Sequence, residues 1–491
     1  MVALRSRWLI LAVFASSFAF IWWLAGNRLV ITNDEGIFLS HAARIAQGEV
    51  LYRDLFGLTG PASYWLLALM FKIAGVSLSS AHLILAAQIA ILSTLVYFTT
   101  RELSDTASGI VGAFVFLFLN AADTAMMTNN HRWDADTYAV CGIVAILRGR
   151  TFLGGVLLAL SVWATPIFAL TALTATAGTV LLKHSPWRVI AGGAVGAAGG
   201  LAALALTGSL FPYVRTLLWM KDNYSDVNRM SYGSVIGGYP ALFEGASGSA
   251  EWALRGVIVA GLTIPVWLPV LCGILLIRNH DRARLFLFAC GVSMIAAVSP
   301  RFDVGHLVFA VPLFYPIAAS FIPKARWTIV PFGALAMLFL FSSIVQRNAT
   351  EQLSTPFGEI HTDPQSAEIV RWLTSNIGPG ERIFVYPYPP IAYLLTGGQN
   401  VSRYCYLHPG LFTAADERLA VEDLTRNPPA KVLYMDISPG ELLRMWPASD
   451  PNRLRLNHLH DFVLSHFEPA ARFRNLQIYT PRTSASIVRR E

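Results

Sequence analysis

Residues 33–75 read "NDEGIFLSHAARIAQGEVLYRDLFGLTGPASYWLLALMFKIAG" and follow the first long apolar run of the chain. The stretch opens with Asp34 and Glu35 directly beside that run, where a carboxylate in hydrocarbon is expensive. It closes with the apolar segment 61–75, which is shorter than the roughly 20 residues that a helix needs to cross a bilayer. We therefore expect residues 27–80 to form a loop on one membrane surface, with interfacial helices.

The composition is that of a membrane protein. Of 491 residues, 54% are hydrophobic and 14% are charged, against roughly 25% charged residues in soluble proteins. The net charge of +7 comes from short basic clusters between apolar runs rather than from one basic face, so nucleic acid is not an expected partner. The four cysteines form no CxxC pair, which leaves neither a disulfide framework nor a zinc motif.

The apolar runs predict a polytopic α-helical membrane protein with about eleven transmembrane helices. The expected spans are 8–26, 81–100, 107–122, 134–148, 151–167, 167–182, 188–207, 252–277, 285–299, 307–322 and 327–345. Basic clusters such as Arg5/Arg7 and Arg148/Arg150 then fall on one side, which the positive-inside rule assigns to the cytoplasm. The predicted topology is N-in and C-out, with residues 1–345 embedded in the membrane.

The composition changes near residue 346 to that of a soluble domain. The runs "RIFVYPY", "KVLYMDI" and "RNLQIYTP" are typical of strands, whereas "QSAEIVRWLTSNI" and "ADERLAVEDLTRN" have helical periodicity. We expect residues 346–491 to form a small α/β domain outside the cytoplasm, without a GxGxxG or P-loop motif.

Asp34 and Glu35 are the first candidate catalytic residues. A local explanation exists, because Thr32-x-x-Glu35 fits a capping box that opens the helix "EGIFLSHAARIAQ". Capping does not exclude a second role. Further along the loop, Tyr52, Arg53 and Asp54 are candidates for substrate binding, and a solvated surface ion pair is the simpler alternative for Arg53 and Asp54.

Two other outer loops carry similar polar groups. The second contains "NNHRWDAD", which offers His131 and Arg132 for substrate binding and Asp134 and Asp136 as further acids. A later loop, "SPRFDVGH", contributes the residues Arg301, Asp303 and His306. Arginine suits a phosphate because its planar fork bonds two oxygens, although an anchor to lipid headgroups is the alternative.

The expected spans contain almost no ionisable residues, whereas the outer loops are rich in them. An ion-coupled transporter needs such groups near the midplane, so the pattern favours chemistry at the outer interface. A carboxylate there can deprotonate a hydroxyl while an arginine holds a departing phosphate. A transporter or flippase of a lipid-linked saccharide is the first alternative, and a sensor or assembly protein is the second.

These motifs resemble the family C membrane glycosyltransferases, which include protein mannosyltransferases, the aminoarabinose transferase of lipid A and rhizobial lipopolysaccharide galacturonosyltransferases. The resemblance rests on Asp-Glu, a helix, Gly-x-x-x-Tyr-Arg-Asp and Gly-Pro-x-x-Tyr within residues 32–75, together with "HRWDAD" and "PRFDVGH". It implies inverting transfer of a hexosyl or pentosyl group from a polyprenyl-phosphate sugar to an acceptor hydroxyl.

By the same resemblance, Asp34 is the general base and Glu35 supports it. The second acid matches Asp134 or Asp136, with Asp134 preferred because it directly follows "HRW". A glycolipid or polysaccharide acceptor is expected ahead of a protein, since no peptide-binding module is visible. We expect a bacterial inner membrane location facing the periplasm, contact with membrane lipids, no metal site and no cofactor, with a divalent cation as the open alternative.

Overall fold

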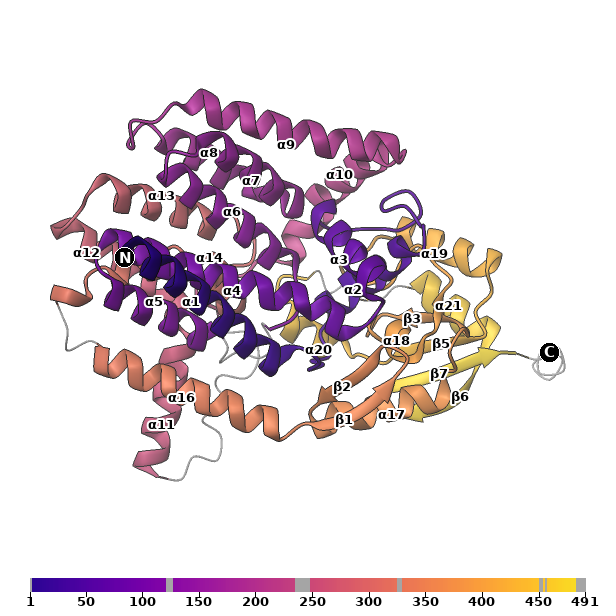
Figure 1. Cartoon of the computed structure of the whole chain (residues 1–491). Coiled ribbons are helices and arrows are strands. Elements are labelled where there is room, and N and C mark those ends of the chain that lie inside the picture. The colour runs from indigo at the N-terminus through magenta and orange to yellow at the C-terminus, as the bar shows by residue number, and fades with distance from the viewer. Residues whose placement is uncertain are drawn as a thin grey trace.

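The computed structural model describes residues 2–120, 127–234, 248–324, 329–449, 454 and 457–482. The described residues before Ala349 form helices joined by loops (Figure 1). The helices there are α1 (Val2–Ala25), α2 (Asn33–Ala46), α3 (Pro61–Ala74), α4 (Leu78–Leu103), α5 (Thr106–Asn120), α6 (His131–Leu147), α7 (Thr151–Ala164), η2 (Pro166–Phe168), α8 (Ala169–Gly178), α9 (Pro186–Leu206), α10 (Leu210–Val227), α11 (Ser249–Leu262), α12 (Ile264–Arg278), α13 (Arg282–Ala296), α14 (Val304–Ala310), α15 (Phe314–Ala319), η4 (Ile322–Lys324) and α16 (Ile329–Asn348).

Within the described residues, three helices are long and apolar enough to cross a membrane by themselves. They are Arg7–Ala25 of α1, α4 and α9, and several shorter apolar helices accompany them. Large apolar side chains on these helices stay exposed, as on the face of α9 that carries Ile190 and Leu201, which suits contact with lipid. The chain is therefore an α-helical membrane protein, while the count of eleven spans and the N-in orientation stay predictions.

Two of the expected spans are interrupted by proline. The run 252–277 is two helices, α11 and α12, which meet at 67° around Thr263 with Pro265 in the first turn of α12. The run 307–322 is divided into α14 and α15, and Pro312 lies between them. Proline lacks the N–H that would continue a helix and clashes with the preceding turn. Residues 325–328, where the expected span 327–345 begins, lie outside the described residues.

The C-terminal part contains two sheets. A hairpin of β1 (Glu351–Thr355) and β2 (Gly358–Thr362) follows α16, and the larger sheet has the order β4-β3-β5-β7-β6 in the described residues. The strand β3 (Arg382–Tyr386) pairs in parallel with β4 (Gln399–Asn400) and with β5 (Lys431–Met435). The strand β7 (Leu476–Pro481) pairs antiparallel with β5 and with β6 (Phe467–Phe473). The helices are α17 (Pro364–Asn376), α18 (Ala392–Thr396), α19 (Ala414–Arg426), α20 (Pro439–Met445) and α21 (Asn457–His466).

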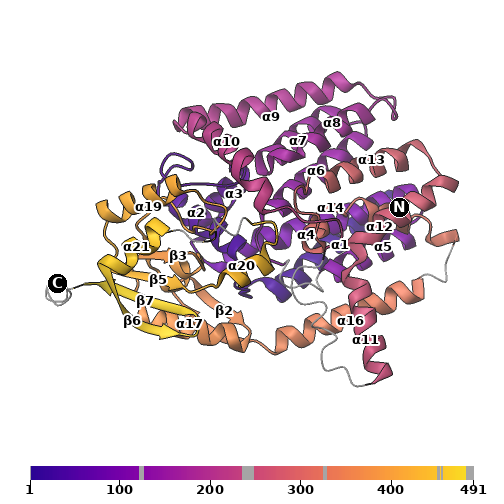
Figure 2. The same ribbon diagram turned by 180° about the vertical axis from the view of Figure 1, so that it is seen from behind.

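The predicted strands and helices of this part occur at the expected positions, and the hairpin, β4 and β6 are additions. Its boundary at residue 346 stays a prediction. The C-terminal part packs closely on the first loop, residues 27–80. The helices α2 and α3 lie between the helical part and the sheet in both views (Figures 1 and 2). The hydroxyl of Ser40 donates to the carbonyl of Pro390 at 3.0 Å, and Arg44 donates to the carbonyl of Ser402 at 2.7 Å.

Candidate active site

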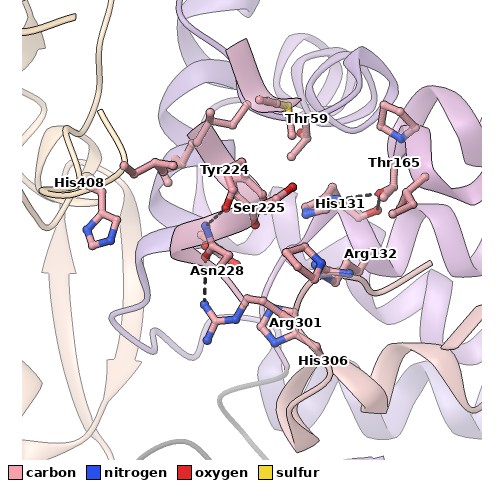
Figure 3. Close-up of a pocket in the computed structure, with 18 of the residues that line it drawn as sticks. Thr59, His131, Arg132, Thr165, Tyr224, Ser225, Asn228, Arg301, His306 and His408 are labelled. Atoms are coloured by element: carbon pink, nitrogen blue, oxygen red, sulfur yellow. Dashed lines mark hydrogen bonds between the residues drawn. The ribbon is translucent and has the colours of Figure 1, made fainter. Parts of the chain in front are cut away.

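A cavity of about 350 Å³ lies where the first loop, the helical part and the C-terminal part meet. Its lining comes from the first two turns of α2, residues 58–64, the start of α6, residues 165–167, α10, residues 297–306 and several C-terminal segments. Figure 3 shows side chains from these separate segments around one space. Segments that lie hundreds of residues apart in the chain therefore form one candidate site.

Asp34 lies on the cavity wall in the first turn of α2, where the helix dipole favours a negative charge. Its side chain is exposed and accepts a hydrogen bond from Nδ2 of Asn130 at 3.2 Å. The amide of Asn130 is oriented by α6, because its Oδ1 accepts the backbone N–H of Arg132 at 2.9 Å and caps that helix. With Oδ1 engaged, Nδ2 is the atom directed to Asp34.

Glu35 points away from the cavity and is buried. One carboxylate oxygen, Oε1, lies 2.8 Å from Nε2 of His82 on α4 and accepts the backbone N–H of Asn129 at 2.7 Å. The predicted capping box is therefore wrong, since the hydroxyl of Thr32 makes no cap bond and Glu35 has found distant partners. Glu35 thus joins the first loop, α4 and the second loop, next to the residue that bonds Asp34.

The start of α6 separates the predicted residues of the second loop into two groups. His131 and Arg132 line the cavity, and Nδ1 of His131 lies 2.7 Å from the hydroxyl of Thr165 (Figure 3). Asp134 and Asp136 follow about one turn later, are buried and do not line the cavity. Asp134 accepts a hydrogen bond from Gln88 of α4. Residues 121–126, the first part of this loop, lie outside the described residues.

The third cluster is organised by Asp303. Its carboxylate lies 2.9 Å from Nδ1 of His306, 3.3 Å from Nε of Arg301, and it caps α14 by accepting the N–H of His306. Burial alone would raise the pKa of Asp303, but bonds and charges from His306 and Arg301 lower it to about 2. The carboxylate is therefore ionised and holds Arg301 and His306, both of which line the cavity.

Tyr52, Arg53 and Asp54 do not line the cavity. Tyr52 has a φ of 66°, which is uncommon for a non-glycine residue, and its phenol donates to the carbonyl of Thr59. Arg53 and Asp54 form a 2.9 Å ion pair, with the arginine side chain 52% exposed. These residues build the turn that brings Thr59 to the cavity wall, and the surface ion pair is the better description of Arg53 and Asp54.

Residues of two further regions line the cavity and were not among the candidates. The helix α10 supplies Lys221, Tyr224 and Asn228, and Nη1 of Arg301 lies 3.5 Å from Oδ1 of Asn228 (Figure 3). The C-terminal part supplies aromatic rings, among them Trp446. The aromatic runs "YPYPP" and "RYCYLHPG" are a partial signal for this part of the lining, but no local pattern indicates which cavity they face.

The charge of the lining is mainly positive. Among the described residues that line the cavity, Arg132, Lys221 and Arg301 are permanent cations, whereas Asp34 is the carboxylate. Arg132 is 5% exposed, and its Nη1 has no hydrogen-bond partner in the described part of the chain. A buried guanidinium nitrogen without a partner is costly unless a ligand fills the place. An anion such as a phosphate fits this lining.

The membrane helices, the loop helices α2 and α3 and the C-terminal sheet together have the fold of the family C membrane glycosyltransferases, as the resemblance predicted. Two solved structures that share the fold are those of ArnT from Cupriavidus metallidurans. The apo state has a TM-score of 0.55 at 12% identity, covering 97% of this chain and 98% of that chain. The complex with undecaprenyl phosphate has a TM-score of 0.53 at 13% identity, covering 98% and 99%.

The sequence itself matches no family model, and no curated protein matches it. At these identities the likeness establishes the fold, so the activity has to be argued from the cavity.

Proposed function

We propose that this protein transfers a sugar from a polyprenyl-phosphate donor to an acceptor hydroxyl at the outer face of the membrane, with Asp34 as general base. The observation that carries the proposal is the cavity, which combines the carboxylate of Asp34 with the cations Arg132, Lys221 and Arg301. A phosphate suits the cations, and a hydroxyl suits the carboxylate. The shared fold with a protein solved with undecaprenyl phosphate supports a lipid-borne phosphate.

The reaction is a single displacement at the anomeric carbon. The acceptor oxygen forms the new bond to that carbon while its proton passes to Asp34. The bond from the carbon to the phosphate oxygen breaks, and its electron pair leaves with the polyprenyl phosphate. Arg132 and Arg301 stabilise the charge that develops on the leaving phosphate. Attack opposite to the leaving group inverts the configuration of the sugar.

The proposal gives Glu35, Asp134 and Asp136 no contact with the substrate, because none of them lines the cavity. Glu35 supports Asp34 through the second loop. The acceptor is a glycolipid or polysaccharide rather than a protein, and the cavity opens on the periplasmic side of a bacterial inner membrane. No metal is needed for the steps above, although a divalent cation beside the phosphate remains compatible with them.

The test compares two carboxylates of the first loop. A strain lacking the protein is complemented with the wild type, Asp34→Asn or Asp54→Asn, and its envelope glycolipids are weighed by mass spectrometry. The wild type restores a species heavier by one sugar, whose mass also gives the donor class. We expect Asp34→Asn to lower this species roughly 100-fold or more, as loss of a general base does, and Asp54→Asn to change it less than about twofold.

Immunoblots of the membranes establish that all three proteins are present at equal levels. Normal product from Asp34→Asn at that level would remove Asp34 from the mechanism, and a glycolipid profile unchanged by deletion of the protein would contradict sugar transfer itself.

A further inference from the structure

The C-terminal part contributes an aromatic wall to the cavity, which consists of Tyr388, Tyr406, His408 and Trp446. The ring of Tyr388 is nearly parallel to that of Trp446, at 15° and 6.2 Å between centroids, and to that of Tyr406, at 26° and 6.1 Å. His408 packs against Trp446 with centroids 3.9 Å apart. These residues come from the segments after β3, after β4 and after α20, so the fold of the C-terminal part holds the wall together.

The wall also carries a directed polar group. The Oη atom of Tyr388 is hydrogen-bonded to Nδ1 of His408, and burial raises the pKa of Tyr388 well above its ordinary value, which keeps the phenol neutral. Burial, with a contribution from Arg301, lowers the pKa of His408 to about 3, so the imidazole is neutral as well. The bond to Nδ1 is the one hydrogen bond of the Tyr388 phenol among the described residues. In the tautomer that gives the phenol O–H this acceptor, the ring proton of His408 is on Nε2.

Nε2 of His408 has no hydrogen-bond partner among the described residues, although the side chain is 3% exposed and belongs to the cavity lining. A buried N–H without a partner is costly. Neither neighbouring phenol bonds Nε2 in the described part of the chain, and that of Tyr388 is engaged at Nδ1. The N–H is therefore a donor that a ligand oxygen can satisfy.

The wall lies within electrostatic reach of the groups that carry out the transfer. Burial is the largest cause of the raised pKa of Tyr388, and the negative charge of Asp34 is the second. The same charge also raises the pKa of Tyr406. The charge of Arg301 acts on His408. The wall, Asp34 and Arg301 also line the same cavity, so a saccharide on the wall would lie in the space that contains the proposed base.

We propose that the aromatic wall binds a pyranose ring of a saccharide acceptor, with the rings of Trp446 and Tyr388 against the C–H face of the sugar and Nε2 of His408 donating to a sugar oxygen. A pyranose combines an apolar face with hydroxyl groups at its edge, and the wall combines flat apolar faces with one directed donor. The inference rests on the proposed function and names its acceptor class. An acyl chain would use the flat faces but has no oxygen along its length to accept from Nε2, and a peptide lacks the flat ring of C–H groups.

Binding of simple saccharides tests the proposal without the natural substrates. Full-length protein in lipid nanodiscs is mixed with methyl glycosides of glucose, galactose, mannose and glucosamine, and saturation-transfer difference NMR records which ligand protons contact the protein. We expect ring-proton saturation for at least one glycoside with the wild type, and at least a fivefold loss with Trp446→Ala. The loss in His408→Ala should be partly restored in His408→Gln, whose amide keeps an N–H donor.

Trp372→Ala is the matched control, since Trp372 stacks on Phe473 at 5.8 Å in the same C-terminal part and does not line the cavity. It should leave the saturation unchanged. Affinity for undecaprenyl phosphate within about twofold of the wild type shows that the cavity of each variant is intact. The proposal is overturned if no glycoside is saturated by the wild type, if the tripeptide Gly-Ser-Gly is saturated more strongly than every glycoside, or if Trp446→Ala equals the wild type.

Asp34→Asn separates this inference from the proposed function. A variant that binds the glycoside but no longer restores the glycolipid supports both. If Asp34→Asn binds the glycoside and still produces normal glycolipid, Asp34 is not the base, but the sugar-binding role of the wall is supported. If Asp34→Asn is inactive and the wild type binds no glycoside, the sugar-binding role of the wall is refuted and the base assignment is not.

Discussion

Removal of the guanidinium of Arg301 tests the phosphate part of the site directly. The side chain is 13% exposed, and its bonds to the protein are long, at 3.3 Å to Asp303 and 3.5 Å to Asn228. Such bonds leave most of its donor capacity for a ligand. In Arg301→Ala the carboxylate of Asp303 keeps its bond to His306, so we expect the cavity to persist while the phosphate loses one charged partner.

The expected magnitude follows from the bond that is lost. A hydrogen bond to a charged group contributes about 1.5–3 kcal/mol. A loss of about 2 kcal/mol raises the dissociation constant of undecaprenyl phosphate roughly 30-fold. Arg301→Lys keeps the charge but not the two-pronged geometry, so a loss of about fivefold is expected. Arg53→Ala is the matched control, because Arg53 is half exposed and pairs with Asp54 outside the cavity.

The assay is a titration of each purified protein, in nanodiscs of zwitterionic lipid, with undecaprenyl phosphate, followed by native mass spectrometry. Wild type and Arg53→Ala should agree within about twofold. If Arg301→Ala also binds as tightly as the wild type while retaining its melting temperature, the phosphate does not lie at Arg301 and the assignment of the basic lining fails.

Two further variants address stability. Glu35→Ala leaves buried donors of the second loop and α4 without their acceptor, so the free energy of unfolding should fall by about 3 kcal/mol and the thermal midpoint in detergent by several degrees. The control Glu368→Ala removes an exposed partner of an exposed arginine and should change the midpoint little. Equal midpoints of the two variants would contradict the buried role of Glu35. The pKa of Asp303 in the folded protein is about 2, which is below the value near 4 of an unfolded chain. Its ionised carboxylate therefore adds about 2 kcal/mol to the free energy of unfolding above pH 4, and this contribution is lost as the pH falls towards 2. Asp303→Asn should therefore melt below the wild type at pH 7 and converge with it near pH 2, and a constant difference between the two would refute this linkage.

The sequence predicted those parts of the fold that depend on local pattern. Apolar length located most helices, and short runs rich in β-branched and aromatic residues located the strands β3, β5 and β7. It could not foresee the bend at Thr263 or the interruption at Pro312, because an apolar run of spanning length looks continuous whichever way proline is accommodated. It also missed β6, whose pairing is with β7 and whose own sequence includes Pro469.

The site was predicted in part for the same reason. Asp34, Arg132 and Arg301 were identified because polar groups concentrate at the ends of apolar runs, and the structure brings them to one cavity. The capping box at Glu35 failed because a tertiary partner, His82, took the carboxylate that the local pattern assigned to the helix start. Lys221 and the aromatic wall were missed because only the packing of distant segments places them there.

The contact between α2 and the C-terminal part has a practical consequence. Gly36 follows Asp34 by two residues, and an added Cβ there would lie 2.7 Å from the backbone nitrogen of Ile391 and 2.9 Å from Pro390, so the two segments touch where a side chain has no room. The position of Asp34, the proposed base, is thus set against a part of the chain that lies some 350 residues later in the sequence. A chimera that takes its C-terminal part from another protein of this fold would therefore also need the α2 helix of that protein. A fragment without the C-terminal part would lack the surface against which α2 is positioned.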